Sequence, residues 1–125
     1  MSEVTEEARL DGRRILVVDD DRDVLESIEQ ALLAEGAETT TCSDGNSAVR
    51  LCETESPELI VLDMMLPKRS GYLVLEKIKR LDDPPRVIMV TANEGRRHQL
   101  GVDAYMLKPV RLERLITLAR DLLSN

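Results

Sequence analysis

The chain alternates between two patterns of apolar residues. Some stretches are short, continuously apolar and rich in β-branched residues, as expected of strands buried on both faces in a parallel sheet. Other stretches repeat apolar residues every three or four positions, as expected of helices with one buried face. The predicted strands are 15–18, 59–62 and 87–90, with two weaker ones at 39–42 and 104–107. The predicted helices fall within 24–32, 48–52, 74–81 and 112–122.

Strands and helices therefore alternate along the chain and are joined by short connections. Such alternation predicts a parallel sheet with right-handed crossovers and helices on both faces. We expect a single doubly wound α/β domain with five strands. The length of 125 residues suits one domain, and it is enough to bury a core without disulfides. Because the chain has no Phe or Trp and only two Tyr, that core must be aliphatic.

Composition excludes several classes of function. The 24 acidic residues outnumber the 17 basic ones, for a formal net charge of −7, and aromatic residues are scarce. An acidic surface of this kind is a poor ligand for nucleic acid, so we expect no direct contact with it. We also expect no membrane contact, since no apolar run approaches the roughly 18 residues that a spanning helix needs.

The N-terminal residues and the two cysteines indicate where the domain begins and in which compartment it works. Residues 1–11 are acidic, without the basic start or apolar stretch of a signal peptide, so we expect an acidic tail over 1–11 and a domain over 12–125. Cys42 and Cys52 have no metal-binding spacing. They are typical of reduced core thiols in a cytoplasmic protein.

Polar residues follow four of the five predicted strands. Asp19 and Asp20 follow the first apolar run, Asp63 the central one, Thr91 the next and Lys108 the last. In open parallel sheets, ligands bind beyond the carboxyl ends of the strands. We therefore expect these side chains to converge at one edge of the sheet.

This set of side chains predicts phosphoryl chemistry. Three close carboxylates repel one another, and a divalent cation relieves the repulsion. Mg²⁺ prefers oxygen ligands and keeps several waters, so it leaves positions open for a phosphoryl group. Thr91 can donate a hydrogen bond to that group and Lys108 can supply positive charge, which are the main needs of phosphoryl transfer. Asp63, alone at the end of its strand, is the expected nucleophile that forms an acyl phosphate.

In combination, these residues resemble the receiver domain of bacterial two-component response regulators over about residues 13–123. The motifs that carry the resemblance are Val17-Val18-Asp19-Asp20-Asp21, Asp63 with Pro67 and Gly71, Thr91-Ala92, and Tyr105 with Lys108-Pro109. The resemblance implies a flavodoxin-like sheet with strand order 2-1-3-4-5. It also implies a cytoplasmic signal-transduction phosphoprotein, which takes part in a phosphorelay through an aspartyl phosphate.

The resemblance further implies how the acidic residues act. Asp63 accepts the phosphoryl group from a histidine kinase or a histidine phosphotransfer protein. Asp20 and Asp63 bind Mg²⁺ directly, together with the backbone carbonyl of Met65, and Asp19 acts largely through water. Such a domain phosphorylates itself and loses the group by autodephosphorylation, so it is not a conventional enzyme.

The remaining motif residues are assigned in the same way. Thr91 and Lys108 bind the phosphoryl oxygens after transfer. Thr91 and Tyr105 then move together and change the surface of the last strand and last helix, which a downstream protein target reads. Tyr105 could instead be plain core filler. We expect the peptide bond between Lys108 and Pro109 to be cis, which an X-Pro bond can adopt at modest cost.

One stretch departs from the family pattern. Thr91 and Lys108 are 17 positions apart, fewer than is usual, and the polar residues 94–100 allow about two helical turns at most. We therefore expect the fourth helix to be shortened, distorted or absent, which puts the usual partner surface in doubt but not the phosphorylation chemistry. In the family, the positions of Met65 and Asn93 flank the attacking water, and the apolar Met65 suggests slow dephosphorylation. We expect His98, in this stretch, to be a solvated residue.

Two other functions fit part of the pattern. Asp19-Asp20-Asp21 contains the Asp-x-Asp of haloacid dehalogenase-like phosphatases. Those enzymes need a further acidic pair at a later strand end, but only a helix follows Lys108, and Asp63 would go unused. The second alternative is a receiver-like interaction module that acts without phosphorylation. The short fourth-helix region favours that module, and the complete set of site residues opposes it.

Overall fold

The computed structural model describes residues 10–92 and 101–124. Within them lies a five-stranded, fully parallel sheet with the order β2-β1-β3-β4-β5, so the predicted order 2-1-3-4-5 is confirmed. All five predicted strands form. They are β1 (Arg14–Val18), β2 (Glu38–Cys42), β3 (Leu59–Asp63), β4 (Arg86–Thr91) and β5 (Ala104–Leu107).

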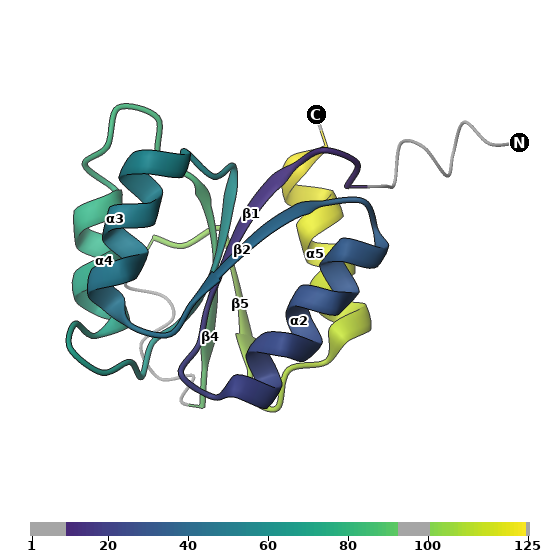
Figure 1. Cartoon of the computed structure of the whole chain (residues 1–125), viewed down its shortest axis with the longest axis horizontal. Coiled ribbons are helices and arrows are strands. Elements are labelled where there is room, and N and C mark those ends of the chain that lie inside the picture. Colours follow the sequence, from purple (N-terminus) through teal and green to yellow (C-terminus); the bar gives the residue numbers. More distant parts are fainter. Residues whose placement is uncertain (1–9, 93–100, 125) are drawn as a thin grey trace, which may run out of the picture.

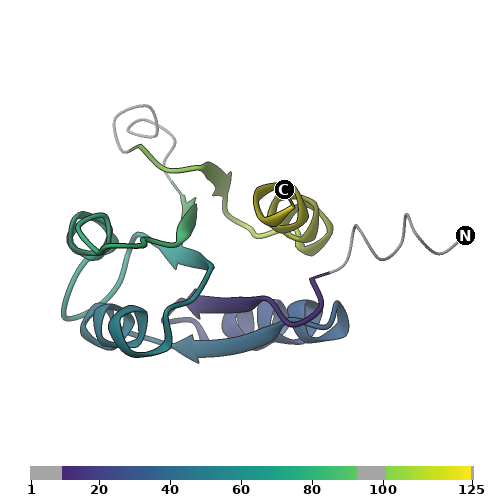
Figure 2. The same cartoon turned by 90° about the horizontal axis from the view of Figure 1, so that it is seen from above.

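Helices cover both faces of the sheet. Figures 1 and 2 show α3 and α4 on one side of the sheet and α2 and α5 on the other. The four predicted helices all form in the described part of the chain. They are α2 (Arg22–Ala34), α3 (Gly45–Glu55), α4 (Gly71–Ile78) and α5 (Leu112–Leu123). Residues 93–100, where we expected a shortened fourth helix, lie outside the described residues.

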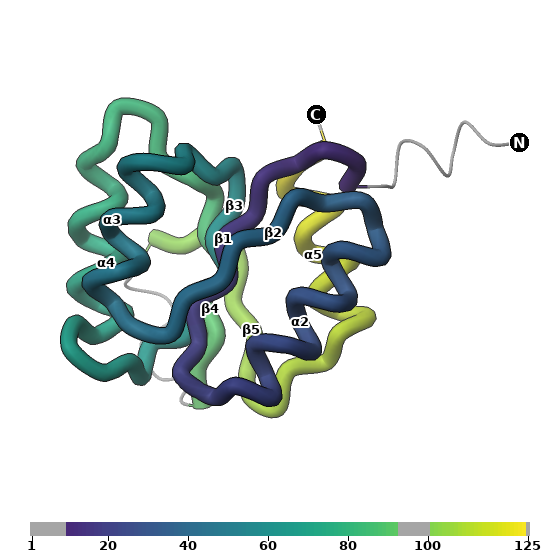
Figure 3. The backbone as a smooth tube through the Cα atoms, in the orientation of Figure 1, coloured from purple at the N-terminus to yellow at the C-terminus, as the bar shows by residue number. Residues whose placement is uncertain are grey.

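Side-chain caps begin three of these helices at the same edge of the molecule. Asp21 accepts two backbone N–H groups of the first turn of α2, as expected of a residue that starts a helix. Asp44 accepts the N–H of Ser47 in α3, and Ser70 accepts that of Leu73 in α4. Such caps satisfy donors that the helix itself leaves unpaired. They fix the positions at which the strand-to-helix connections enter α2, α3 and α4, along the lower edge in Figure 3.

The core has two aliphatic layers, one on each face of the sheet. Because side chains alternate along a strand, Val17 and Val61 pack with α2 and α5, whereas Leu16 and Ile60 pack with α3 and α4. β3 lies in the middle of the sheet and all five of its residues are buried. Two well-packed layers therefore support the strand that ends at Asp63.

The chain approaches β1 through a packed segment. Leu10, which the sequence pattern places in the acidic tail, is 1% exposed and belongs to the layer with α2 and α5. Its N–H donates to the carbonyl of Glu35, and the N–H of Gly12 donates to that of Gly36. The packed structure thus includes Leu10. Over residues 10–92 and 101–124, every helix is too short or too polar to cross a membrane.

Candidate functional site

The carboxyl ends of four strands bring the predicted side chains together. Asp63 ends β3 and Thr91 ends β4, while Asp19 directly follows β1 and Lys108 directly follows β5. The parallel register keeps these ends level, since Asp63 pairs with Val90 in β4. Asp19, Asp63 and Thr91 are the buried polar residues of the described chain. The expected convergence at one edge is therefore what the fold produces.

Three carboxylates form a compact acidic cluster at this edge. Asp19, Asp20 and Asp63 each offer a carboxylate oxygen, and these oxygens lie within 4.8 Å of one another. Asp19 and Asp63 are buried, whereas Asp20 is exposed to solvent. The strand ends therefore hold the two buried carboxylates in place, and the cluster is open to solvent on the side of Asp20.

Lys108 reaches into the acidic cluster from β5. Its Nζ lies 3.2 Å from Oδ2 of Asp63 and 3.8 Å from Oδ2 of Asp19. Burial lowers the pKa of Lys108, but the hydrogen bond to Asp63 and the neighbouring carboxylate charges outweigh it and raise the pKa above its ordinary value. The ammonium is therefore held in its charged form.

Asp19 has a strongly perturbed pKa. Burial raises it from an ordinary value of 3.8 to about 6. A hydrogen bond from the N–H of Asp21 opposes the rise, the charge of Asp63 adds to it, and Lys108 again opposes it. One cation thus compensates three carboxylates only in part, and the site retains excess negative charge.

The donor set fits a hard divalent cation. The cluster offers oxygen donors only, on two buried acids and one exposed acid, and Mg²⁺ is commonly held by one or two carboxylates with waters completing its shell. A dipositive ion there would also relieve the repulsion that helps to raise the pKa of Asp19. The residues that could hold it are Asp19, Asp20 and Asp63.

The connection between β3 and α4 is tied to the same site. The N–H of Met65 donates to Oδ1 of Asp63 at 3.1 Å. The N–H of Gly71 donates to the carbonyl of Met64, and a Cβ at Gly71 would lie 2.5 Å from Cα of Met64 and 2.7 Å from the carbonyl oxygen of Asp63. Glycine eight positions after Asp63 therefore lets α4 begin directly against the end of β3.

The end of β5 is joined to the end of β4 beside the site. The N–H of Lys108 donates to the carbonyl of Thr91 at 2.9 Å. The peptide bond between Lys108 and Pro109 is cis, as expected. Tyr105 is half-buried in β5 and packs against the layer that contains α3 and α4. Its predicted role as a switch remains a prediction.

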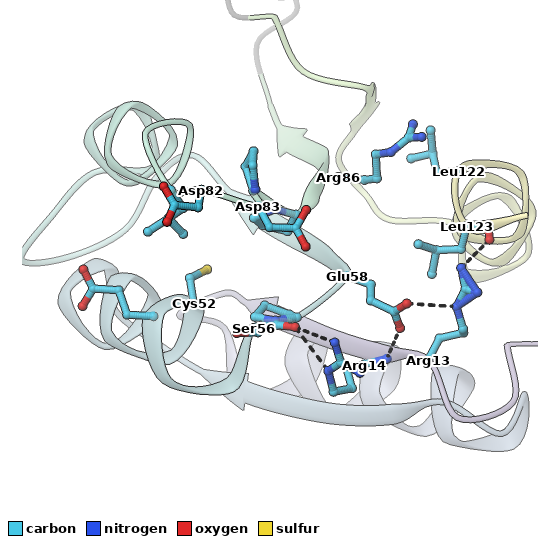
Figure 4. Close-up of a pocket in the computed structure, with 15 residues that line it drawn as sticks. Arg13, Arg14, Cys52, Ser56, Glu58, Asp82, Asp83, Arg86, Leu122 and Leu123 are labelled. Carbon is cyan, nitrogen blue, oxygen red and sulfur yellow. Dashed lines mark hydrogen bonds and ion pairs between the residues drawn. The ribbon is translucent and has the colours of Figure 1, made fainter. Parts of the chain in front are cut away.

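A polar cavity of about 560 Å³ lies at the opposite, amino end of the sheet (Figure 4). Its arginines are engaged within the chain. Arg14 donates to the carbonyl of Ser56, and Arg13 pairs with Glu58 and donates to the carbonyl of Leu123. These contacts tie the start of β1 to the end of α5, and none of these residues belongs to the acidic cluster.

Some residues considered in the sequence analysis cannot be placed. Asn93, His98 and the other residues of 93–100 lie outside the described residues, as do residues 1–9 of the expected tail.

Cys52 is buried and Cys42 is half-buried, and burial raises their pKa values to about 12 and about 11, respectively. Both thiols therefore stay protonated near neutral pH, in line with a structural role.

Fold and site together define a doubly wound α/β domain with an acidic cluster at the carboxyl edge of its sheet, and comparison with known proteins identifies the family. The response regulator receiver domain family matches residues 15–120. The chain belongs to this family, the receiver domains of the response regulators of two-component systems. The resemblance inferred from the motifs is thereby confirmed.

Similar proteins include longer transcriptional regulators. The chain is 37% identical over 103 residues to the alkaline phosphatase synthesis transcriptional regulatory protein PhoP of Bacillus subtilis, covering 78% of the chain and 43% of PhoP. It is 35% identical over 115 residues to the response regulator MprA of Mycolicibacterium vanbaalenii, covering 88% of the chain and 50% of MprA. The chain therefore spans about half the length of the curated relatives it matches.

One similar solved structure carries a metal. The receiver domain of the sensor histidine kinase PA1611 from Pseudomonas aeruginosa aligns with a TM-score of 0.77 and 32% identity, over 89% of this chain and 94% of that one. In that structure a magnesium ion is coordinated in the active site cleft.

Proposed function

We propose that the chain accepts a phosphoryl group on Asp63 in a Mg²⁺-dependent reaction, from a histidine kinase or a histidine phosphotransfer protein in the cytoplasm. The observation that carries this proposal is the environment of Asp63. It is a buried carboxylate within 4.8 Å of two others, with Met65 donating to one of its oxygens and Lys108 to the other. Family membership supports the same reaction.

The proposed transfer depends mainly on holding the nucleophile in line with the phosphorus and on neutralising the charge of the phosphoryl oxygens. A carboxylate oxygen of Asp63 attacks the phosphorus of a phosphohistidine, the new O–P bond forms as the N–P bond breaks, and the donor imidazole leaves with that electron pair. Mg²⁺, held by Asp20, Asp63 and the carbonyl of Met65, with Asp19 acting through water, would neutralise charge on the phosphoryl oxygens. Burial of Asp63 at the end of β3 fixes its direction of attack.

Two further residues are suited to hold the product. The ammonium of Lys108, 3.2 Å from Asp63, is placed to pair with a phosphoryl oxygen once the carboxylate has become an acyl phosphate. Thr91 brings a buried hydroxyl to the same edge. Because Lys108 and Thr91 are joined through their backbones, we propose that Thr91 and Tyr105 respond together and that β5 and α5 present the altered surface to a downstream protein target.

The surface beside Lys108 supports a protein donor. A groove of about 280 Å³ lies between the first turns of α2 and the start of α5, and its lining is mainly apolar. The apolar lining residues are Val24, Ile28, Pro109, Val110 and Leu112. An apolar groove next to the acceptor favours a partner that docks a helix face while it presents its phosphohistidine.

The test is intact-mass spectrometry after incubation with Mg²⁺ and acetyl phosphate. We expect one added phosphoryl group on the wild type and none on Asp63→Asn or without Mg²⁺. Asp121→Asn, a matched change on the exposed face of α5, should be labelled like the wild type.

Some receivers accept only from a protein donor, so a panel of phosphorylated kinases completes the experiment. Failure of both acetyl phosphate and the panel would contradict the proposal and favour an interaction module that acts without phosphorylation. Labelling of Asp63→Asn to the wild-type level would assign the acceptor to another residue.

A further inference from the structure

We propose that the N-terminus of α3, through Gly45, positions the connection between β3 and α4 and thereby sets the affinity of the acidic cluster for its divalent cation. This inference rests on the proposed function of that cluster. Gly45 would be a positioning residue, because it lies in the neighbouring connection and acts only through the chain that carries Met65. The connection in question is residues 64–70, between the end of β3 and the start of α4.

The contact between Gly45 and this connection is made by backbone. The N–H of Gly45 donates to the carbonyl of Pro67 at 3.5 Å. A Cβ at position 45 would lie 2.0 Å from the carbonyl oxygen of Arg69 and 2.6 Å from its Cβ. The backbone of Arg69 could not move far enough to admit a Cβ at position 45 without displacing the neighbouring residues. The close approach, and not an unusual backbone angle, therefore requires glycine here.

A side-chain contact reinforces the backbone contact. Nε of Arg69 donates to Oδ1 of Asn46, the second residue of α3, at 3.0 Å. Between Pro67 and Arg69 the chain turns tightly, since the N–H of Arg69 donates to the carbonyl of Pro67 at 2.7 Å and Lys68 has a positive φ of 69°. Such a conformation costs energy in a residue other than glycine and persists where its surroundings hold it. The start of α3 provides those surroundings.

The held turn is next to the metal-binding end of the connection. Only Leu66 separates Pro67 from Met65, whose N–H donates to Asp63 and whose carbonyl is the proposed backbone ligand. The far end is fixed at Gly71 and the near end at Met64, which donates to Val90 in β4. With both ends fixed, a displacement at Arg69 has to be absorbed between them. Met65 lies in that interval.

The experiment measures Mg²⁺ affinity and stability separately on the unphosphorylated protein. Mg²⁺ is titrated and followed by amide chemical shifts in NMR, including the amide of Met65. The free energy of unfolding is measured by urea without metal. For Gly45→Ala we expect Mg²⁺ to bind at least about tenfold more weakly, the size of effect seen when support of a metal ligand is lost.

Gly12→Ala is the matched control. Gly12 has a φ of +72°, so alanine strains the backbone there, yet a Cβ would meet nothing within 4 Å. It precedes β1, at the end of the sheet away from the acidic cluster. Both variants should lose stability, and Gly12→Ala should keep the Mg²⁺ affinity of the wild type. A purely structural role for Gly45 would make the two variants alike.

The outcomes separate this inference from the function on which it rests. Wild-type affinity in folded Gly45→Ala would overturn the inference alone, provided that Asp63→Asn abolishes binding. A wild type that binds no Mg²⁺ would overturn the proposed function and the inference with it. If Gly45→Ala does not fold, Asn46→Ala replaces it, since it removes the acceptor of Arg69 at an exposed position without adding atoms. We expect about a threefold loss of affinity for that variant, and unchanged affinity would overturn the inference.

Discussion

At the scale of single residues, Asp19 shows how the fold prepares a charged site. It is 2% exposed, two other carboxylates face it, and its pKa rises to about 6. The folded protein therefore holds a proton on Asp19 at a pH where the unfolded chain has already lost it. The contribution of the Asp19 proton to the free energy of unfolding without metal should be fully present below about pH 4 and should be lost as the pH rises through about 6.

Asp19→Asn tests this account of the site. The amide keeps an oxygen to accept the N–H of Asp21 but cannot ionise. Without metal, we expect the variant to be roughly 2 to 3 kcal/mol more stable than the wild type at pH 7, and about equal to it at pH 4. Urea unfolding at the two pH values gives the comparison. A variant less stable than the wild type at pH 7 would show that the carboxylate of Asp19 is compensated within the metal-free site.

At the scale of elements, a glycine decides how closely α4 can follow β3. A Cβ at Gly71 would lie within 3 Å of Met64 and of the carbonyl of Asp63, all of them buried. For Gly71→Ala we expect a loss of roughly 2 kcal/mol or more in the free energy of unfolding. Urea unfolding measures it, with Gly12→Ala for comparison at about 1 kcal/mol. Equal losses in the two variants would mean that α4 can shift to admit the side chain.

The elements were largely predictable from the sequence, because apolar periodicity reports which faces are buried. The convergence of the site residues was predictable for a related reason, since Asp63, Thr91 and Lys108 each end or follow a strand and parallel strands end together. The contact of Gly45 with Arg69 was not predictable. Its two partners are 24 positions apart, and the Asp-Gly-Asn sequence at the start of α3 carries no sign of what it will contact.

At the scale of the whole molecule, Leu10 shows where a local pattern fails. It stands among acidic residues and belongs to no periodic stretch, so the sequence places it in a tail. In the structure it completes the layer that contains α2 and α5. Only long-range packing, which a local pattern does not contain, reveals that.

Leu10→Ala should therefore destabilise the domain. We expect a loss of about 2 to 4 kcal/mol in the free energy of unfolding, as is usual when a buried leucine is truncated. Leu33→Ala is the matched control, since Leu33 is 50% exposed on α2 and should lose less than about 1 kcal/mol. Thermal or urea unfolding of both variants measures the two losses in the free energy of unfolding. Similar losses would mean that Leu10 contributes no more than a surface residue.

The position of the proposed acceptor Asp63 within the sheet bears on how a change there could spread. β3 is paired on both sides and buried throughout, so Asp63 ends a strand that neighbours hold on each side. β5, by contrast, is an edge strand with a single paired neighbour, and Leu107 at its end is exposed. If Asp63 is phosphorylated as we propose, the β3–β4 and β4–β5 ladders are the backbone connection through which a change at Asp63 would reach that edge.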